Sequence, residues 1–399
     1  MKLSDIAEFI TDKISSSSIS LDSYVTTDSL LQNKRGREQA QNLPPMQCAL
    51  TNYKKGDVLV ANIRPYLKKV WFADSEGGCS SDVLVFRAKN GHYPSFLYAI
   101  LMQDAFFDYA MLGAKGSKMP RGDKNQIMRY ELPTLTSAEE ENIGNIMVDI
   151  ISKINVNRQI NDNLEAMAKQ LYDYWFVQFD FPNEKGKPYK LSGGAMVWNE
   201  KLKRKIPQGW SNGVLSDVAN ITMGQSPDGS SYNEDGEGII FYQGSTDFGL
   251  RFPDIRQYTT SPSRYANKGD ILMSVRAPVG ALNIANNDCC IGRGLSALSS
   301  KIGSITHLYY LMNDFRLKFE GMNSAGTTFG SITKDELFSL PVIIPTKSVI
   351  SEFEQVCEPI FDKQMIIGEE INALTKQRDE LLPLLMNGQA TVNYHLFDD

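Results

Sequence analysis

Two segments of the chain carry apolar residues at the spacing of a coiled-coil heptad. In the first segment the two seam series are Ile143, Ile150, Asn157, Leu164 and Leu171, and Met147, Ile154, Asn161, Ala168 and Trp175. A shift of 210 residues without a gap gives Phe353, Ile360, Ile367, Leu374 and Leu381, and Cys357, Gln364, Ile371, Arg378 and Leu385. Eight of the ten residues are apolar in each segment, and this period over five heptads predicts two long helices that pack on each other.

Four polar residues interrupt this seam, namely Asn157, Asn161, Gln364 and Arg378. We expect them to fix the register and pairing of the helices at a modest cost in stability. A role in binding a ligand is the alternative.

Short β-branched runs lie between Gly, Pro, Asn and Asp clusters in the remainder of the chain. Examples are "DVLVANI", "SDVLVFR", "GIIFYQG" and "DILMSV", which are typical of strands joined by turns. A β-rich region therefore precedes each long helix, and the predicted fold class is α+β.

The same order of short motifs occurs twice along the chain. "LSDIAEFI" from Leu3 matches "LSDVANIT" from Leu215, and "KKGDVLVANIRP" matches "NKGDILMSVRAP". "FLYAILM" matches "HLYYLMN", and the segments around Gly116 and Gly326 both close on Leu-Pro. Because all of these matches fall at offsets of 208 to 213 residues, the sequence predicts an internal repeat.

The order of region, helix, region and helix predicts how the two helices pack. The first helix delivers the chain to the second region, and the second helix starts close to that region, so a packed pair must run antiparallel. The expected molecule has a β-rich region at each tip and a pseudo-twofold axis. About 35 helical residues span about 50 Å, which suits two half-sites on duplex DNA roughly one helical turn or a small multiple of it apart.

Charge, cysteine content and hydropathy exclude several classes of protein. The net charge is −6, and residues 346–399 alone hold 4 basic and 10 acidic residues, so the first 345 residues are neutral overall. Five cysteines without C-x-x-C spacing and three scattered histidines give little support for a disulfide framework or a zinc site. No secretory signal or apolar run of membrane-spanning length is present, so we expect a cytoplasmic protein without a membrane partner.

With these motifs in order, the chain resembles the specificity subunits of type I restriction-modification systems. The resemblance extends over essentially the whole length and includes "IPQGW", "ITMGQSPDGSSY", "LYDYWFVQFDF" and "LLPLLMNG". It departs from the family in the first region, which lacks a Pro-x-Gly-Trp opening. The start of that region at residue 1 is inferred from "LSDI" alone.

The resemblance implies a domain organisation and a set of partners. Target-recognition domains are expected at residues 1–140 and 206–347, long helices at 141–178 and 348–388, a linker at 179–205 and a tail at 389–399. Each recognition domain would read one half of a bipartite, asymmetric double-stranded DNA target. The helices would set the spacing and dock modification methyltransferase subunits, two per chain, in a complex that also holds restriction translocase-nuclease subunits.

Catalytic motifs are absent from the sequence. An adenine methyltransferase would need an [N/D]-P-P-[F/Y] motif, and a phosphate-binding loop would read G-x-x-x-x-G-K-[S/T]. The charged segment "DFPNEKGKP" is interpreted as a linker turn rather than a nuclease site. The chain is therefore not expected to be an enzyme or to bind a cofactor, and S-adenosylmethionine, ATP and Mg²⁺ are implied for the partner subunits only.

Candidate DNA contacts are basic and polar residues in sequence typical of loops, because cations neutralise phosphates and polar side chains read base edges. For each of them a surface salt bridge is the alternative, and for Arg64 and Arg276 this would be an ion pair with Asp57 and Asp270. The candidates are Lys34, Arg35, Arg37, Arg64, Lys68, Lys69, Lys115, Lys118, Arg121, Lys124, Gln225, Ser226, Tyr232, Arg264, Arg276, Arg293, Thr327 and Thr328.

Four aromatic residues near the end of the first helix, Tyr172, Tyr174, Trp175 and Phe176, are candidates for docking a partner protein. Ordinary packing of the helix is the alternative. For the whole chain, a stand-alone DNA-binding regulator with two unlike half-site readers is the alternative function, and an enzyme of unrecognised type is a further one. The regulator would bind its site tightly without partners.

Overall fold

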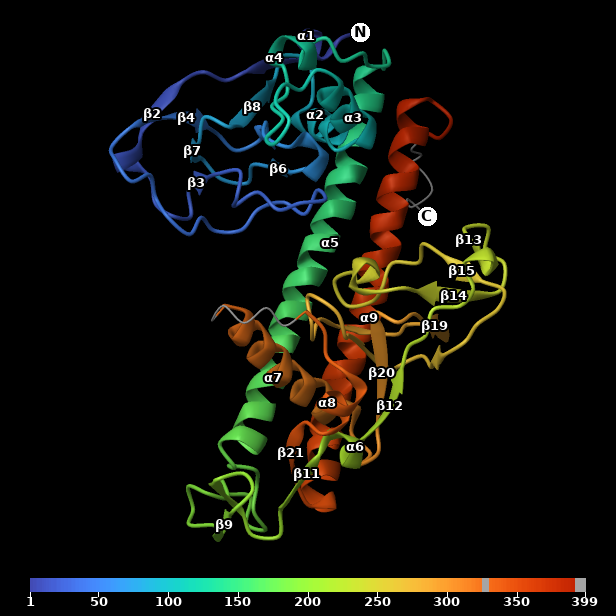
Figure 1. Ribbon diagram of the computed structural model, residues 1–399. Coiled ribbons are helices and arrows are strands. Elements are labelled where there is room, and N and C mark those ends of the chain that lie inside the picture. The colour runs from blue at the N-terminus through green and yellow to red at the C-terminus, as the bar shows by residue number, and fades with distance from the viewer. Residues whose placement is uncertain (325–329, 392–399) are drawn as a thin grey trace, which may run out of the picture. The chain divides into compact units, whose positions relative to one another are not determined.

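The computed structural model describes residues 1–324 and 330–391 (Figure 1). The chain forms two compact units, one of Met1–Asn157 with Ile371–Asp399 and one of Arg158–Glu370. Two long helices, α5 (Ser137–Tyr172) and α9 (Lys347–Met386), each contribute to both units. The structure thus confirms an α+β fold with two β-rich regions and two long helices.

The first unit contains two four-stranded sheets and short helices. One sheet has the order β1-β8-β5-β6 and the other the order β2-β4-β7-β3. The strands are β1 (Ala7–Phe9), β2 (Lys13–Ser15), β3 (Tyr24–Val25), β4 (Ala49–Tyr53), β5 (Val58–Ala61), β6 (Val70–Phe72), β7 (Gly77–Cys79) and β8 (Val83–Ala88). The helices are α1 (Leu3–Ile6), α2 (Pro94–Leu101), α3 (Asp104–Leu112) and α4 (Lys124–Ile127), with 3-10 turns η1 (Ser16–Ser18) and η2 (Pro65–Leu67).

The second unit repeats this plan with a larger second sheet. Its sheets have the orders β12-β20-β17-β18 and β13-β15-β14-β19-β16. The strands of these sheets are β12 (Ala219–Met223), β13 (Tyr232–Asn233), β14 (Ile239–Tyr242), β15 (Tyr258–Thr259), β16 (Tyr265–Ala266), β17 (Ile271–Ser274), β18 (Leu282–Ile284), β19 (Cys289–Ile291) and β20 (Leu295–Ser300). Strands β11 (Ser211–Val214) and β21 (Pro341–Ile344) form a separate pair, and the helices are α6 (Leu215–Val218), α7 (Ile305–Ser324) and α8 (Lys334–Phe338), with turns η4 (Gly229–Ser231) and η5 (Ser245–Asp247).

The first sheet of each unit has the same pairing register. Ala7 pairs with Ala88 in the first unit, and Ala219 pairs with Ser300 in the second. Each residue of the second pair lies 212 positions after its counterpart in the first. Val58 pairs with Phe86, and Ile271 pairs with Leu298 at the corresponding place in the second sheet. The structure therefore confirms the internal repeat at the level of individual strand partners.

The heptad seam is buried along both helices. Every seam residue from Ile143 to Trp175 and from Phe353 to Leu385 is buried or half-buried. In the second unit, Asn161 Nδ2 donates to the carbonyl oxygen of Gln364 at 3.4 Å, while Tyr172 packs against Phe353 with ring centroids 6.4 Å apart. As α5 advances, its partners on α9 therefore step backwards, so the helices pack antiparallel in this unit.

The linker after α5 is folded rather than extended. The last turn of the helix continues as a π-helical turn, η3 (Asp173–Val177), and Phe179 and Phe181 then contact Trp210 at 5.5 and 5.2 Å between ring centroids. Strands β9 (Met196–Asn199) and β10 (Arg204–Pro207) form a hairpin. The buried carboxylate of Asp180 accepts a hydrogen bond from the backbone N–H of Leu191 at 2.8 Å, which is a structural role.

Candidate nucleic-acid interface

Arg64 and Arg276 occupy equivalent loops in the two repeats. Each follows the strand that the repeated K-G-D turn begins, β5 or β17, and each side chain is exposed. Arg64 donates its backbone N–H to Pro120 at 2.7 Å, and Ala277 donates in the same way to Gly330 at 3.1 Å. The loop around Gly116 therefore lies against the loop of Arg64.

The alternative ion pairs for these two arginines are not formed. Both carboxylate oxygens of Asp57 accept hydrogen bonds from Arg87 at 2.7 Å. No cation within the described ranges lies at ion-pair distance from Asp270, whose carboxylate instead accepts the backbone N–H of Asn267 at 2.8 Å. Both Arg64 and Arg276 are consequently available to a ligand.

Four of the candidates in the second repeat come together beside strand β19. The backbone N–H of Gln225 donates to Ile291 at 3.0 Å, and the hydroxyl of Ser226 accepts the backbone N–H of Arg293 at 3.3 Å. The carbonyl oxygen of Arg264 accepts the N–H of Ile291 at 2.9 Å. The exposed side chains of Gln225, Arg264 and Arg293 therefore share one surface.

This surface also reaches Arg276, because Val275 donates its backbone N–H to Gly294 at 2.9 Å. Tyr232 is half-buried. Its hydroxyl donates a hydrogen bond to the carbonyl oxygen of Pro227 at 3.0 Å, and its ring packs against Phe241. Thr327 and Thr328 lie outside the described residues.

The equivalent surface in the first repeat is built from other side chains. The side chain of Arg121 binds the carboxylate of Asp82 at 3.1 Å. Asp82 is the residue of the first repeat that corresponds to Gly294 in the second. Lys115 and Arg121 exchange two backbone hydrogen bonds of 2.9 Å, and this closes a loop in which Lys118 is exposed. Lys115 and Lys124 are also exposed, and Lys115 lies 3.7 Å from Asp123.

The basic residues between β3 and β6 are engaged to different degrees. Arg35 is exposed, whereas Arg37 donates to the carbonyl oxygen of Asp22 at 2.6 Å and lies 4.3 Å over the ring of Trp71. Lys69 donates to the carbonyl oxygen of Thr27, and burial lowers its pKa. Lys34 and Lys68 both bind the carboxylate of Asp104, at 2.8 and 2.9 Å.

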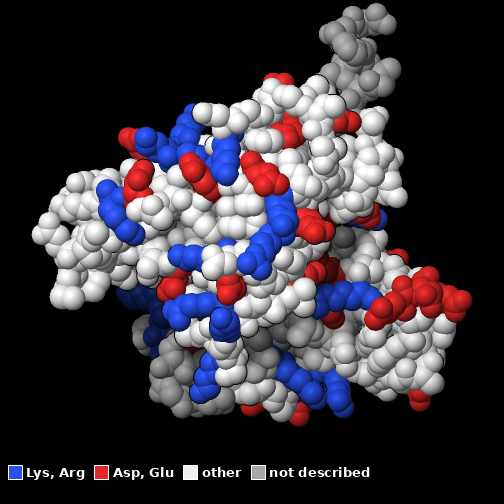
Figure 2. Space-filling view, turned by 90° about the horizontal axis from the view of Figure 1, so that it is seen from above, with Lys and Arg blue, Asp and Glu red and all other residues white. Residues whose placement is uncertain are grey.

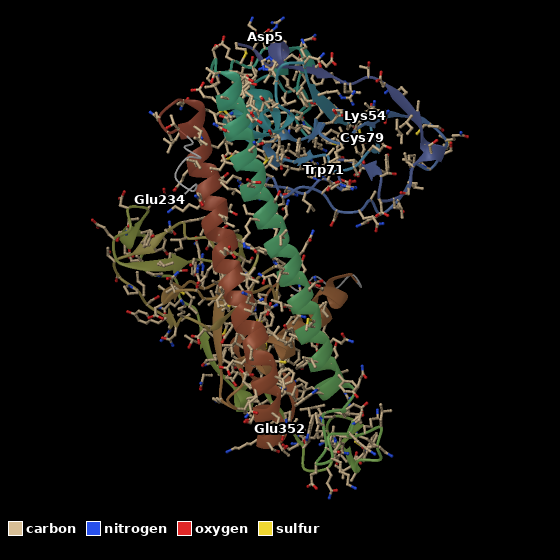
Figure 3. All side chains as sticks on the ribbon, turned by 180° about the vertical axis from the view of Figure 1, so that it is seen from behind. Asp5, Lys54, Trp71, Cys79, Glu234 and Glu352 are labelled. Carbon is tan, nitrogen blue, oxygen red and sulfur yellow. The ribbon has the colours of Figure 1, made fainter. Side chains whose placement is uncertain are left out.

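The face drawn in Figure 2 carries its charges in small groups. On the side of the molecule drawn in Figure 2, Lys and Arg side chains of the described residues lie in several groups with Asp and Glu between them. Figure 3 labels Glu234 at the outer end of the loop between β13 and β14, where Glu234, Asp235 and Glu237 are exposed.

Comparison with known proteins gives a consistent result. Residues 207–380 match the family model described as the type I restriction modification DNA specificity domain. The putative type I restriction enzyme MjaX specificity subunit of Methanocaldococcus jannaschii is 28% identical over 309 residues, which cover 75% of this chain and 68% of that protein. The HindI specificity subunit of Haemophilus influenzae is 22% identical and covers 92% of this chain and 94% of its own.

The chain belongs to the type I restriction-modification specificity subunits. The solved S subunit of a type I system from M. genitalium shares the fold, with a TM-score of 0.61 at 15% identity, and the match covers 97% of this chain and 95% of that one. This specificity subunit supplies DNA specificity to a restriction-modification enzyme and is itself non-catalytic.

Two further observations concern ligands and membranes. Among residues 1–324 and 330–391, no cluster of three or more His, Cys, Asp or Glu side chains could hold a metal ion. No helix in the described part of the specificity subunit is long and apolar enough to cross a membrane.

The aromatic residues at the end of α5 are buried or half-buried. Tyr172, Trp175 and Phe176 are buried in a cluster with Phe353 and His307, and Tyr174 is half-buried. Burial raises the pKa of Tyr172 well above its usual value and lowers that of His307 to about 3. This burial favours the alternative of ordinary helix packing. The helices α9 and α7 cover the apolar seam of α5 here, and sequence periodicity alone does not distinguish a covered seam from an open surface.

Sequence reasoning missed one cation of the specificity subunit altogether. Arg251 stands alone in the sequence "FGLRFPD", outside any basic cluster, yet its side chain is only 9% exposed and binds Glu165 and Gln364. A single charged residue flanked by apolar ones in a loop is the only signal that the sequence offers for it.

Proposed function

We propose that this specificity subunit reads a split, asymmetric double-stranded DNA target, with one half-site read by each β-rich region. The observation that carries the proposal is the pair of equivalent surfaces at Arg64 and Arg276. The strands beneath them have the same register, whereas the side chains around them differ. Two copies of one scaffold with unlike contact residues suit two unlike half-sites.

The proposed contacts come from the exposed loops of the predicted domains at residues 1–140 and 206–347. Arg64, Arg276 and Arg293 lead the set, because all three are exposed. Within one repeat the proposal also includes the exposed or half-buried side chains of Arg35, Arg37, Lys68, Lys69, Lys115, Lys118, Arg121 and Lys124, and in the other those of Gln225, Ser226, Tyr232 and Arg264.

Methylation mapping of host DNA by single-molecule sequencing tests the proposal directly. A split motif whose halves differ is the expected result, and a palindromic or unsplit motif would contradict it. With the motif known, Arg276→Ala combined with Arg293→Ala should weaken binding to duplexes through the second half-site while the complex still assembles. Arg64→Ala is the matched control and should weaken the first half-site only.

We further propose that the long helices set the half-site spacing and dock the methyltransferase subunits. Ile160 and Met167 support this, because they are 39% and 53% exposed and lie two turns apart on one face of α5. Met167→Glu should abolish co-purification of the methyltransferase subunit, whereas the neighbouring exposed variant Ala166→Glu should not. Equal recovery of both complexes would exclude this face.

The same proposal assigns the remaining components to partners. S-adenosylmethionine, ATP and Mg²⁺ would bind to the methyltransferase and translocase-nuclease subunits, where the chemistry takes place. A cytoplasmic location is part of the proposal, and it agrees with the five free cysteines of the chain.

A further inference from the structure

Lys34 and Arg251 occupy equivalent places in the two repeats. Strand β3 pairs parallel with β7 in the first unit, and β14 pairs parallel with β19 in the second. Each cation lies nine residues beyond the end of that parallel strand, in the long connection to the next antiparallel strand, β4 or β15. This equivalence rests on strand pairing, because the two connections share little sequence beyond Thr27-Asp28 and Thr246-Asp247.

Lys34 is held by two carboxylates from different elements. Its side chain is 7% exposed, and its ammonium lies 2.8 Å from Asp104 at the start of α3 and 3.1 Å from Asp379 on α9. Lys68 also binds Asp104 at 2.9 Å, and Arg378 binds Asp379 with two hydrogen bonds of 3.0 and 2.9 Å. Burial alone would raise the pKa of both aspartates, but these cations outweigh it and hold both values below the usual range.

Arg251 is held between both long helices. One terminal nitrogen donates to Gln364 Oε1 on α9 at 3.1 Å, and the other lies 3.5 Å from Glu165 Oε2 on α5. Gln364 Nε2 donates to the same Glu165 oxygen at 2.9 Å, and the guanidinium lies 4.8 Å over the ring of Phe361.

Each cation thus reaches the helix that belongs to the other repeat. Lys34 precedes α5 but binds α9, and Arg251 precedes α9 but binds Glu165 of α5. In the 210-residue alignment of the helices, Glu165 corresponds to Thr375, one helical turn before Asp379. Asp379 itself corresponds to Lys169, so the two contacts lie one helical turn apart in the aligned helices and not at the same position.

We propose that Lys34 and Arg251 are positioning residues for DNA recognition, each fixing the loop of one recognition region on the helix of the opposite repeat. A nearly buried cation between carboxylates tolerates little displacement, because any shift leaves a charge unpaired. Lys34 thereby fixes the loop that presents the exposed Arg35, a proposed DNA contact. This inference rests on the proposed function and changes the role assigned to Lys34 from a phosphate contact to an internal anchor.

The neighbouring residues Lys34 and Arg35 allow a matched test in the complete complex with methyltransferase subunits. Binding of a duplex that carries the mapped target is measured as a function of salt. Lys34→Met should weaken target binding roughly tenfold or more, as a damaged half-site does, without changing the slope of log affinity against log salt. Arg35→Met should make that slope shallower by about 0.9, as the loss of one phosphate contact does.

A second readout requires no DNA. Hydrogen exchange of residues 26–40 should become faster in Lys34→Met and stay unchanged in Arg35→Met, while Lys34→Arg should restore both exchange and target affinity. Arg251→Met should act in the same way on the second half-site, with exposed Leu250→Met as its control. A shallower salt slope for Lys34→Met, or unchanged exchange and affinity, would overturn the inference, whereas failure to find a split motif would affect the proposed function alone.

Discussion

The K-G-D turns of the two repeats have the same backbone hydrogen bond, but the surroundings of their aspartates differ: Asp57 is buried and Asp270 is half-buried. In both, the aspartate accepts the N–H three residues before it at 2.8 Å, from Lys54 to Asp57 and from Asn267 to Asp270. The glycines between them have φ of 91° and 94°. Lys54, labelled in Figure 3, begins the first of these turns.

The difference lies across the sheet. Arg87 of strand β8 binds Asp57 in the first repeat, whereas the equivalent position on β20 is Ser299, whose hydroxyl accepts a hydrogen bond from Asn220. The repeated K-G-D motif therefore specifies a turn that leads into a strand, and among the described residues the ion pair is present in the first repeat only. The two turns share the aspartate hydrogen bond and the positive φ of the glycine.

Removal of the added cation should have the largest effect. In Arg87→Leu the carboxylate of Asp57, which is 2% exposed, loses the cation that binds it, and we expect a loss of about 3 kcal/mol in stability of the first unit. Hydrogen exchange of β5 peptides at increasing urea measures this loss. Ser299→Ala, at the equivalent position, should change exchange of β17 little, and equal losses at the two sites would refute the comparison.

Substitution of the turn glycines should have a smaller effect that is equal in the two repeats. A Cβ at Gly56 or Gly269 meets no atom closer than 3.9 Å, so the cost comes from the backbone conformation alone. We expect Gly56→Ala and Gly269→Ala each to cost about 1 to 2 kcal/mol, measured by the same exchange experiment. A cost at one site only would show that the two turns are not equivalent.

The sequence predicted the features that depend on periodicity and repetition. The heptad seam, the strand regions and the duplicated plan all follow from side-chain spacing, which reports burial directly. The polar seam residue Gln364 also follows, since it is buried and binds both Asn161 and Glu165. Gln364 also accepts a hydrogen bond from Arg251, which no periodicity could reveal.

The features that the sequence did not predict depend on contacts between distant segments. Lys34 and Arg35 are neighbours in one basic cluster, yet one is buried between carboxylates and the other is exposed. Tyr172 and Phe176 lie at the end of a helix, where exposure is plausible, yet α7 and α9 cover them. Local composition cannot separate such cases, because burial of a charge is decided by a partner more than 300 residues away in the chain.

The smallest effect should come from the carboxylate that lacks a cation. Burial raises the pKa of Asp270, the N–H of Asn267 partly opposes this, and nearby Asp288 raises it further. Because the folded-state pKa lies above the unfolded value, the unfolded chain releases the proton first as the pH rises. The free energy of unfolding should therefore fall between the ordinary carboxyl pKa and the raised one.

Asp270→Asn sharpens this last contrast between the repeats. The amide oxygen can still accept the N–H of Asn267, so the turn should persist while the pH dependence of the second unit flattens above about pH 4. At neutral pH the variant should be at least as stable as the parent chain, measured by exchange of β17 across a pH series. Asp57→Asn, by contrast, should destabilise the first unit because Arg87 loses its partner, and a similar loss in Asp270→Asn would mean that a cation serves this carboxylate too.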